Sequence, residues 1–248
     1  MRGFILAAGF GTRLKPITDE VPKALVQVCG EPLLAHNLRR LYRSGVFSAI
    51  GVNSHYLHEQ MERFQEESEI PFELFYEKDK IRGTGGALDF ARSFLSGDEA
   101  FLIANVDILH KFDIAELSAR FMGAERICSL VSIPASNGCG TILYDNVTGD
   151  FLGTNADRRN GSLPPVPDER KSDADFTGVA FYKREFLDFV DDDDFSIVPI
   201  WQRAAVNGHT VGVLIPEKNA SWWLDIGTHE ALKRIHDDVD SGAVDLWN

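Results

Sequence analysis

The sequence is poor in positive charge and has no long apolar run. Against 38 Asp and Glu, its 248 residues include only 25 Lys and Arg, which gives a formal net charge of −13 at pH 7. This balance argues against general binding to DNA or to anionic lipid, because attraction to phosphates requires a basic surface. No segment approaches the ~20 consecutive apolar residues of a membrane span. We therefore expect neither a nucleic acid nor a membrane as partner.

Cysteine is also scarce. Cys29, Cys128 and Cys139 are an odd number of cysteines at spacings that match no zinc pattern. The apolar run near the start, residues 3–9, is too short for a signal peptide and leads into a glycine-rich segment rather than a cleavage site. The simplest interpretation is a cytoplasmic protein with reduced thiols.

Strand-like and helical patterns alternate along the first half of the chain. Amphipathic helical patterns begin at Pro32, Tyr56 and Ala87, and Gly45 is placed to end the first of them. Between and beyond them are short runs rich in β-branched or aromatic residues, at 4–8, 49–53, 72–76, 100–104, 127–133 and 211–215. This alternation predicts an α/β fold with a Rossmann-like mixed, mostly parallel sheet and helices on both faces.

The pattern changes after about residue 131. Residues 141–152 have the strand–turn–strand pattern of a hairpin. Residues 155–175 are polar and contain three prolines, so we expect a loop lying over the sheet edge. The acidic run Asp191–Asp194 lacks the spacing of a calcium loop and is interpreted as a solvated linker.

The most informative segment follows the first predicted strand. It reads Leu6-Ala7-Ala8-Gly9-Phe10-Gly11-Thr12-Arg13-Leu14-Lys15-Pro16-Ile17-Thr18, and Pro22-Lys23-Ala24-Leu25 comes shortly after it. A buried strand that ends in small residues and two glycines lets backbone N–H groups approach an anion. Arg13, Lys15 and Lys23 then place three cations within eleven residues of an acidic chain. That local reversal of sign is what a polyphosphate site requires.

Two commoner phosphate-binding motifs do not account for this segment. The dinucleotide fingerprint requires a third glycine where this chain has Leu14. The P-loop requires Gly-Lys-Ser or Gly-Lys-Thr, and neither tripeptide occurs in the sequence. A surface turn with incidental lysines would explain a lone glycine pair, but not this combination with Thr12-Arg13 and Pro22-Lys23.

The segment resembles the signature of the sugar-phosphate nucleotidyltransferases, also called NDP-sugar pyrophosphorylases. Their pattern is Leu-Ala-Ala-Gly-x-Gly-Thr-Arg-Leu-x-Pro-Leu-Thr followed by Pro-Lys-x-Leu, and only Ile17 departs from it. The resemblance continues through residues 29–33, 52–57 and 83–88 and ends at 223–228, so it covers nearly the whole chain. It implies the nucleotide-diphospho-sugar transferase fold in one domain, residues 1–248. The expected nucleotide-binding half is 1–130, the expected sugar-binding half is 131–248, and no C-terminal β-helix is expected.

The same resemblance implies an activity. A nucleotidyl group would pass from a nucleoside triphosphate, with UTP favoured, to a sugar 1-phosphate, giving an NDP-sugar and pyrophosphate. The short single-domain form is similar to the uridylyltransferases that act on N-acetylmuramic acid 1-phosphate in bacterial cell-wall recycling. The alternative is a guanylyltransferase or cytidylyltransferase for mannose 1-phosphate, glucose 1-phosphate or a phospho-alcohol such as phosphocholine. A nucleotide-sugar sensor without turnover is the alternative from another class. No pattern indicates the oligomeric state.

Site residues are carried over from the family motifs position by position. Arg13 and Lys23 are the expected catalytic residues, which bind the triphosphate. Asp107 and Asp225, each at a predicted strand-to-helix junction, are the expected ligands of Mg²⁺, which proteins hold through one or two carboxylates plus substrate oxygens. The other nucleotide contacts are expected from Leu6, Ala7, Ala8, Gly9, Gly11, Thr12, Gly85 and Gly86, and the sugar contacts from Asn105, Thr177 and Gly178.

Two further side chains are considered near this site. Arg158 or Arg159 could supply a cation for the sugar phosphate, and the sequence does not decide between them. His110 follows Asp107 closely, and we expect it to be exposed to solvent.

Overall fold

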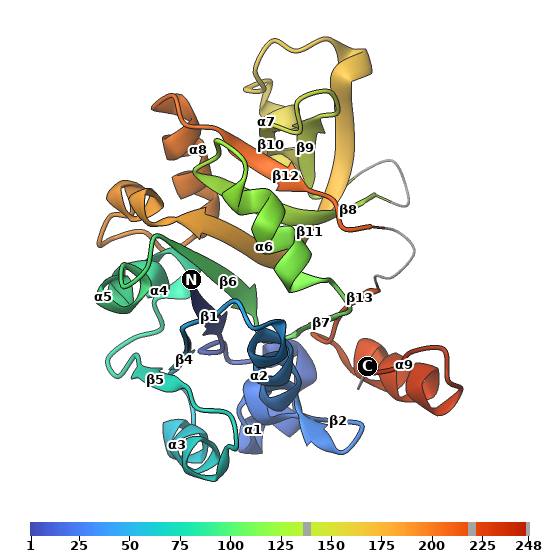
Figure 1. Ribbon diagram of the computed structural model, residues 1–248. Coiled ribbons are helices and arrows are strands. Elements are labelled where there is room, and N and C mark those ends of the chain that lie inside the picture. The colour runs from blue at the N-terminus through green and yellow to red at the C-terminus, as the bar shows by residue number, and fades with distance from the viewer. Residues whose placement is uncertain (136–139, 218–221, 247–248) are drawn as a thin grey trace.

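The computed structural model describes residues 1–135, 140–217 and 222–246, and Cys139 lies outside them. Cys29 and Cys128 carry free thiols. Within these ranges one nine-stranded sheet runs through the molecule in the order β10-β9-β11-β6-β1-β4-β5, with β8 joined to β11 and β12 to β8 (Figure 1). Its strands are β1 (Arg2–Leu6), β4 (Ala49–Ser54), β5 (Glu73–Tyr76), β6 (Ala100–Asn105), β8 (Cys128–Pro134), β9 (Ile142–Asp145), β10 (Phe151–Thr154), β11 (Lys171–Lys183) and β12 (Val211–Leu214). Two small ribbons pair β2 (Gln27–Val28) with β3 (Glu31–Pro32) and β7 (Ile108–His110) with β13 (Trp223–Asp225).

Strand direction divides the sheet. β1 runs parallel to β4 and β6, and β4 parallel to β5, whereas β11 is antiparallel to β6, β8 and β9. In the order β5-β4-β1-β6, the chain adds β4 and β5 on one side of β1 and then adds β6 on its other side, where Leu6 pairs with Asn105. Open α/β sheets bind ligands at such a switch point, beyond the carboxyl ends of the strands. The predicted Rossmann-like α/β class is confirmed.

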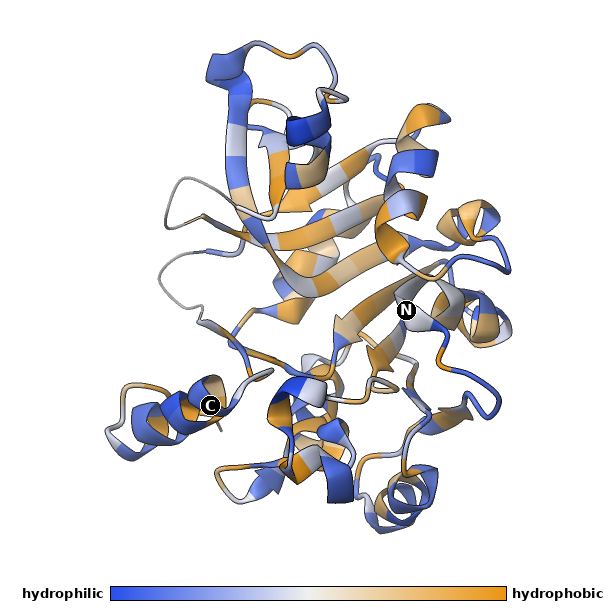
Figure 2. Cartoon of the chain, turned by 180° about the vertical axis from the view of Figure 1, so that it is seen from behind, coloured by the Kyte–Doolittle hydropathy of each residue, from blue (hydrophilic) through white to orange (hydrophobic). Residues whose placement is uncertain are grey.

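Helices cover both faces because the central strands alternate their buried side chains. Phe101 and Ile103 of β6 enter one core with α4 (Gly83–Phe90), α5 (Arg92–Leu95) and α8 (Ile197–Val206). Leu102 and Ala104 enter the other with α2 (Leu33–Ser44), α3 (His58–Glu67) and α6 (Ile114–Met122). Figure 2 shows the result as hydrophobic central strands beneath helices with hydrophilic outer faces. The remaining helical segments are α1 (Ile17–Glu20), α7 (Asn155–Asn160), α9 (His229–Asp240), and the short 3₁₀ helices η1 (Thr12–Leu14), η2 (Lys23–Leu25), η3 (Asp168–Arg170) and η4 (Arg184–Phe189).

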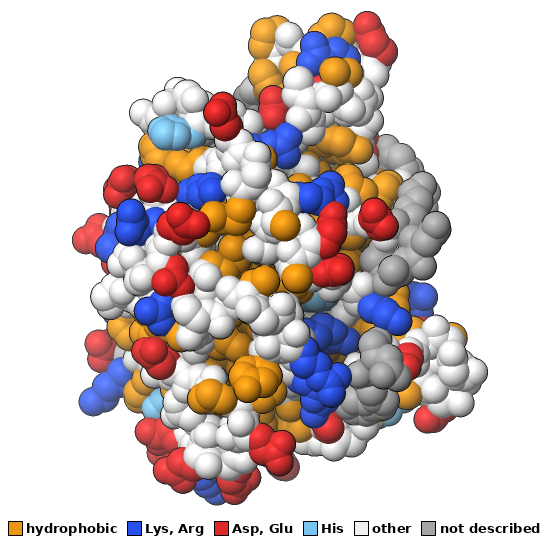
Figure 3. Space-filling model, viewed as in Figure 1, with side chains coloured by type: hydrophobic (Ala, Val, Ile, Leu, Met, Phe, Trp, Pro, Cys, Tyr) orange, Lys and Arg blue, Asp and Glu red, His pale blue; other side chains and the backbone are white. Residues whose placement is uncertain are grey.

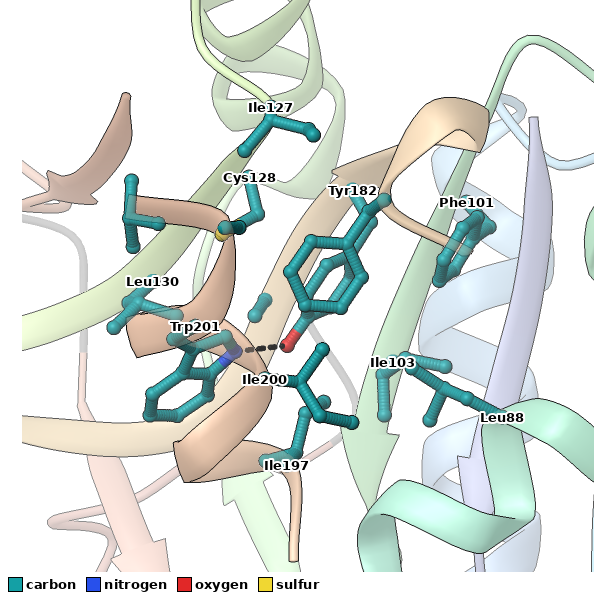
Figure 4. Packing of buried hydrophobic residues seen from close by; sticks show 14 of the residues in the cluster. Leu88, Phe101, Ile103, Ile127, Cys128, Leu130, Tyr182, Ile197, Ile200 and Trp201 are labelled. Atoms are coloured by element: carbon teal, nitrogen blue, oxygen red, sulfur yellow. Dashed lines mark hydrogen bonds between the residues drawn. The ribbon is translucent and has the colours of Figure 1, made fainter. Parts of the chain in front are cut away.

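A buried polar contact fixes α8 to the sheet. Trp201 and Tyr182 are each 1% exposed, and the Trp201 Nε1–H donates to the Tyr182 hydroxyl at 3.1 Å (Figure 4). Tyr182 also stacks on Phe101, with ring centroids 5.1 Å apart. Because the indole and phenol groups satisfy each other, both rings can be buried without leaving an unpaired polar atom. α8 is thereby fixed to β11 at Tyr182, which pairs with Phe101 near the amino end of β6.

Several predicted boundaries are confirmed. Gly45 adopts a left-handed conformation after α2, and its N–H donates to the Tyr42 carbonyl at 3.2 Å. The predicted hairpin forms from β9 and β10, which are antiparallel. Both follow from local turn chemistry that is readable in the sequence.

The prediction of a loop over residues 155–175 is wrong. This segment contains α7, whose N-terminus is a reciprocal capping box between Thr154 and Asp157, and the first part of β11. Arg158 places two hydrogen bonds of 2.9 Å on the Asp173 carboxylate. Polar side chains here stabilise structure through caps and ion pairs rather than burial, so the hydrophobic pattern did not reveal it.

A third core joins the start of the chain to its last helix. Leu14 of η1, Ile226 and Ile235 of α9 are completely buried in it together with Leu109 of β7. Thr228 caps α9 by accepting a hydrogen bond from the Ala231 N–H at 3.2 Å. The glycine-rich segment and the residues after β13 are thus packed side by side, although they lie more than 200 residues apart.

The surface carries mixed charge. On the face in Figure 3, described acidic and basic side chains are interspersed, and small hydrophobic areas lie between them. Among the described residues, no helix has both the length and the apolar character that crossing a bilayer requires.

Candidate active site

The glycine-rich segment after β1 folds back over η2. Gly11 has φ +63°, and a Cβ on it would lie 2.9 Å from the Cβ of Lys23 and 2.9 Å from Cγ2 of Thr18. The Thr18 hydroxyl donates to the Gly11 carbonyl at 2.9 Å and holds this approach. Gly9 has open space around its Cα, since a Cβ added there would meet no heavy atom within 4 Å. Glycine at position 11 is therefore required by the fold, and Gly9 leaves backbone accessible.

Lys23 contacts Asp107, one of the two predicted metal ligands. Its ammonium group forms an ion pair with Asp107, and the two side chains are only 11% and 16% exposed. Asp107 lies between β6 and β7, and the preceding residue, Val106, is held by two hydrogen bonds. Its N–H donates to the Leu6 carbonyl at 3.1 Å, and its carbonyl accepts from Asn37 Nδ2 at 2.9 Å. The carboxylate is therefore presented from a fixed turn.

Asp225 comes to the same place from the far end of the chain. β13 pairs with β7, so Asp225 lies opposite Ile108, and the Ile226 N–H donates to the Asp107 carbonyl at 2.8 Å. Arg13 lies beside Asp225, with Nη2 3.9 Å from Oδ2. Asp107 thus directly precedes β7, Asp225 ends β13, the strand paired with β7, and each carboxylate faces one of the two predicted catalytic cations.

The carboxylate pair fits a divalent cation that also binds phosphate oxygens. The Oδ1 atom of Asp225 is buried and has no hydrogen-bond partner among the described residues. An orphaned buried carboxylate oxygen is costly unless something binds it. The described residues contain no group of three or more Asp, Glu, His or Cys side chains that would enclose a metal. A site of two carboxylates that leaves coordination positions open suits Mg²⁺ with substrate phosphates.

A cavity of about 200 Å³ opens beside Asp107, at the carboxyl ends of β1, β4 and β6. Its lining includes residues predicted to bind the nucleotide, the sugar and the metal, and it also includes residues that were not predicted to belong to the site. Its lining is Leu6, Ala8, Gly9, Lys23, Asn53, Ile81, Gly83, Thr84, Asn105, Val106 and Asp107. The cavity therefore lies at the switch point of the sheet, where a nucleotide is expected.

Gly85 and Gly86 do not line this cavity, although they directly follow Gly83 and Thr84 in the first turn of α4. A Cβ on Gly85 would be 3.0 Å from the Ser196 carbonyl oxygen, and one on Gly86 would be 2.9 Å from that of Asp194. The Ile197 N–H also donates to the Thr84 hydroxyl at 2.9 Å. These glycines allow α4 to pack against the chain before α8, while Gly83 and Thr84 face the cavity.

On the predicted sugar side, Gly178 and Asn105 lie together. Gly178 has φ +81°, and a Cβ there would meet Asn105 Nδ2 at 2.9 Å. The register of β11 against β8 shifts between Phe176 and Val179, which is where this glycine lies. Thr177 is fully buried, and its hydroxyl donates to the Val131 carbonyl at 2.7 Å. The side chain of Thr177 is thus engaged inside the sheet, whereas Gly178 leaves room beside Asn105.

The structure also places His110 and Arg158, the two further side chains considered near the site. His110 is 2% exposed, so the expectation of solvent exposure is wrong. It stacks on Phe112 and its Nδ1 accepts the Phe112 N–H at 3.1 Å, and burial lowers the pKa of its imidazole well below 6.5. Arg158 is engaged with Asp173, as described above, and forms part of the α7–β11 contact.

Sequence reasoning missed a buried polar pair behind the cavity. Asn53, at the end of β4, and Glu77, after β5, are 2% and 1% exposed. Asn53 Nδ2 donates to Glu77 Oε1 at 2.8 Å, and Asn53 Oδ1 accepts the Ala7 N–H at 2.6 Å. The only available signal was the polar residue that ends the strand-like run 49–53.

Comparison with known proteins identifies relatives of this chain. Residues 2–242 match the model of the family described as "Nucleotidyl transferase". The N-acetylmuramate alpha-1-phosphate uridylyltransferase of Caulobacter vibrioides is 30% identical over 92% of both chains. The mannose-1-phosphate guanyltransferase beta-A of Xenopus laevis is 31% identical over 61% of this chain, which spans 43% of that protein.

A solved structure supports the fold. HddC from Yersinia pseudotuberculosis, crystallised with GMP-PN, is 16% identical and superimposes with a TM-score of 0.73 over 96% of this chain and 99% of its own. At that identity the likeness concerns architecture alone. The family match, which spans almost the entire sequence, establishes that the chain belongs to the nucleotidyl transferase family.

Proposed function

We propose that this protein transfers a uridylyl group from UTP to a sugar 1-phosphate, with N-acetylmuramic acid 1-phosphate as the candidate acceptor. One observation carries the reaction class: Lys23–Asp107 and Arg13–Asp225 converge beside a glycine-lined cavity at the switch point of the sheet. The choice of base and sugar rests on the similarity to the Caulobacter uridylyltransferase, which extends over 92% of both chains.

The reaction needs no protein nucleophile. A phosphate oxygen of the sugar 1-phosphate, ionised near neutral pH, forms a bond to the α-phosphorus, while the bond to the β-phosphate bridging oxygen breaks and pyrophosphate leaves. Catalysis is then alignment and charge neutralisation. We assign Lys23 to the triphosphate oxygens and Arg13 to the departing pyrophosphate, so each cation exchanges its carboxylate for phosphate oxygens when substrate binds.

The remaining roles follow from position. Asp107 and Asp225 would hold Mg²⁺, which supplies neutralisation of phosphate charge when bound. Residues 6–12 would receive the nucleotide through backbone groups, with Gly85 and Gly86 supporting that wall from α4. Asn105 and Gly178 would meet the sugar, with Thr177 fixing β11, the strand that carries Gly178.

The test is a pyrophosphate-release screen of four nucleoside triphosphates against a panel of sugar phosphates in the presence of Mg²⁺. We expect the highest kcat/KM for UTP with N-acetylmuramic acid 1-phosphate. The second candidate, a guanylyltransferase acting on mannose 1-phosphate, is favoured by the partial match to the Xenopus protein. Turnover with GTP and mannose 1-phosphate would select it, and release of pyrophosphate from no pair would refute the reaction class.

A further inference from the structure

A single carboxylate ties together three segments that form the cavity. Glu77 accepts from Asn53 Nδ2 through Oε1 at 2.8 Å, and from the Arg82 N–H through Oε2 at 2.8 Å. Asn53 in turn accepts the Ala7 N–H at 2.6 Å. Ala7 opens the glycine-rich segment, Asn53 lines the cavity, and Arg82 directly precedes Gly83, which also lines it. The Glu77 side chain is therefore bonded directly to the end of β4 and to the residue before α4, and it is linked to the end of β1 through Asn53.

The direction of this chain of hydrogen bonds is determined by its ends. The Ala7 N–H can only donate, so it requires the oxygen of the Asn53 amide and leaves the amide nitrogen facing Glu77. The Arg82 N–H can likewise only donate. Both oxygens of Glu77 therefore have to accept, which a carboxylate does and a neutral amide cannot do.

Glu77 is an expensive residue to bury. It is 1% exposed, and within the described residues no Lys, Arg or His side chain forms an ion pair with it. Its own backbone is held as well, because its N–H donates to the Ser54 carbonyl at 2.8 Å. Burying a carboxylate against neutral donors costs stability, and such groups are typical of functional sites rather than of ordinary cores.

We infer that Glu77 is a positioning residue for the nucleotide: through Asn53 and the Arg82 N–H it sets the cavity wall against which the triphosphate substrate binds. Glu77 itself does not line the cavity. Its effect is therefore on the KM for the nucleoside triphosphate, and the sugar side at Asn105 and Gly178 is unaffected. This inference rests on the proposed nucleotidyl transfer.

The decisive test exchanges the two polar groups. In Glu77→Gln, one amide N–H₂ faces another donor; in Asn53→Asp, two carboxylates face each other. The double variant Asn53→Asp/Glu77→Gln restores every bond: the new Asp accepts from Ala7 and from the new Gln amide, and the Gln oxygen accepts from Arg82. We expect each single variant to raise the KM for the nucleotide about tenfold, with the KM for the sugar phosphate unchanged. The double variant should return to within about threefold of wild type.

A matched control separates positioning from simple stability. Asp145, at the end of β9, is another buried carboxylate (3% exposed): it accepts the Val147 N–H at 2.9 Å, it also forms an ion pair with Arg170, and it does not line the cavity. Asp145→Asn should lower the melting temperature and leave both KM values unchanged. If Glu77→Gln behaves like Asp145→Asn, or if the effects of the two single variants simply add in the double variant, the inference is overturned.

A substitute variant and a binding measurement cover the cases in which Glu77→Gln does not fold or wild type shows no turnover. If Glu77→Gln does not fold, Glu77→Asp, which keeps the charge and shortens the side chain, takes its place; loss of melting temperature with an unchanged nucleotide KM would again overturn the inference. If wild-type protein releases no pyrophosphate, the proposed reaction fails. In that case the affinity of wild type, of the two single variants and of the double variant for UTP is measured directly by calorimetry. Single variants that bind UTP as tightly as wild type would refute the positioning role.

Discussion

Lys23 and Asp107, 84 residues apart, form an ion pair that is largely shielded from solvent. Arg13 and Asp225 repeat the arrangement in more exposed form. Each cation assigned to phosphate therefore already faces an anion assigned to the metal. The substrate-free site is electrically balanced, which limits the cost of keeping these charges together in a partly buried place.

Replacing Asp107 with Asn should remove turnover without unfolding the protein. The amide keeps the shape but loses the charge that would hold Mg²⁺, and we expect kcat to fall at least about 100-fold. Asp113→Asn is the control, because Asp113 caps α6 by accepting the Glu116 N–H at 2.9 Å. An unchanged kcat in Asp107→Asn, measured over a range of Mg²⁺ concentrations, would remove the carboxylate from the mechanism.

Lys23→Met should lower kcat/KM about 100-fold, because a charge on the triphosphate is lost in a water-poor site. Lys171→Met is the comparison. Lys171 pairs with Asp168, whose side chain is 95% exposed, so that pair contributes little. Pyrophosphate release gives kcat/KM for both variants, and similar values for the two would contradict the role of Lys23.

Gly227→Ala should disturb the second ion pair. A Cβ at this position would lie 2.3 Å from Arg13 Nη2 and 2.6 Å from Asp225 Oδ1. Both groups have to move, and we expect kcat to fall at least about tenfold. In Gly123→Ala, by contrast, the new Cβ would be an ordinary 3.4 Å from the Ala119 carbonyl oxygen. If steady-state kinetics give the same kcat for Gly227→Ala and Gly123→Ala, catalysis does not require this arrangement of Arg13 and Asp225.

Gly178→Ala tests the sugar side. The added Cβ would meet Asn105 Nδ2 at 2.9 Å, and the φ of +81° is strained for alanine. Gly208→Ala supplies the same strain alone, since Gly208 has φ +85° and open space around it. Both variants should lose about 1 kcal/mol of stability, but only Gly178→Ala should raise the KM for the sugar phosphate, by about tenfold or more. An unaltered KM would place the sugar elsewhere.

The pH dependence of stability tests the run Asp191–Asp194. Asp194 is not a solvated residue: its side chain is 8% exposed and accepts from Arg203 Nη1 at 2.8 Å and Nη2 at 2.9 Å. The hydrogen bonds from Arg203 lower the pKa of Asp194 below 3.8. Because the folded-state pKa is the lower one, the stabilisation is fully present above pH 3.8 and is lost as pH falls through the folded value.

Asp194→Asn should therefore melt at a lower temperature than wild type at pH 6, and the gap should narrow as the pH drops below about 4. The exposed Asp192 of the same run provides the control variant Asp192→Asn. If the difference in melting temperature between Asp194→Asn and wild type does not depend on pH, the ionised carboxylate is not the source of the stabilisation.

Local features of the sequence predicted most of the fold. The glycine-rich segment, the strands that became β1, β4 and β6, and the end of α2 at Gly45 all follow from short-range patterns. The segment 155–175 was missed because its order comes from a capping box and from Arg158–Asp173, which leave no hydrophobic period.

The candidate site was harder to predict where its parts meet only in space. The two aspartates were found from family motifs, but the Asn53–Glu77 pair joins residues whose spacing has no periodic meaning. Gly85 and Gly86 were assigned to the nucleotide wall from the family motif at residues 83–88, yet their Cα atoms face the carbonyl oxygens of residues 194 and 196. Which side of a helix turn meets a cavity depends on tertiary packing, and a motif does not specify it.

The third core has a consequence for biosynthesis. Translation delivers β1, β4, β5 and β6 first, while β13, which carries Asp225, emerges more than 100 residues after the end of β6. Chains fold from the N-terminus as they leave the ribosome. A nascent or clipped polypeptide that lacks Asp225 retains the glycine-rich turn and Lys23 but has only one of the two acidic groups, so under the proposed function activity would arise only after β13 has been synthesised and has paired with β7.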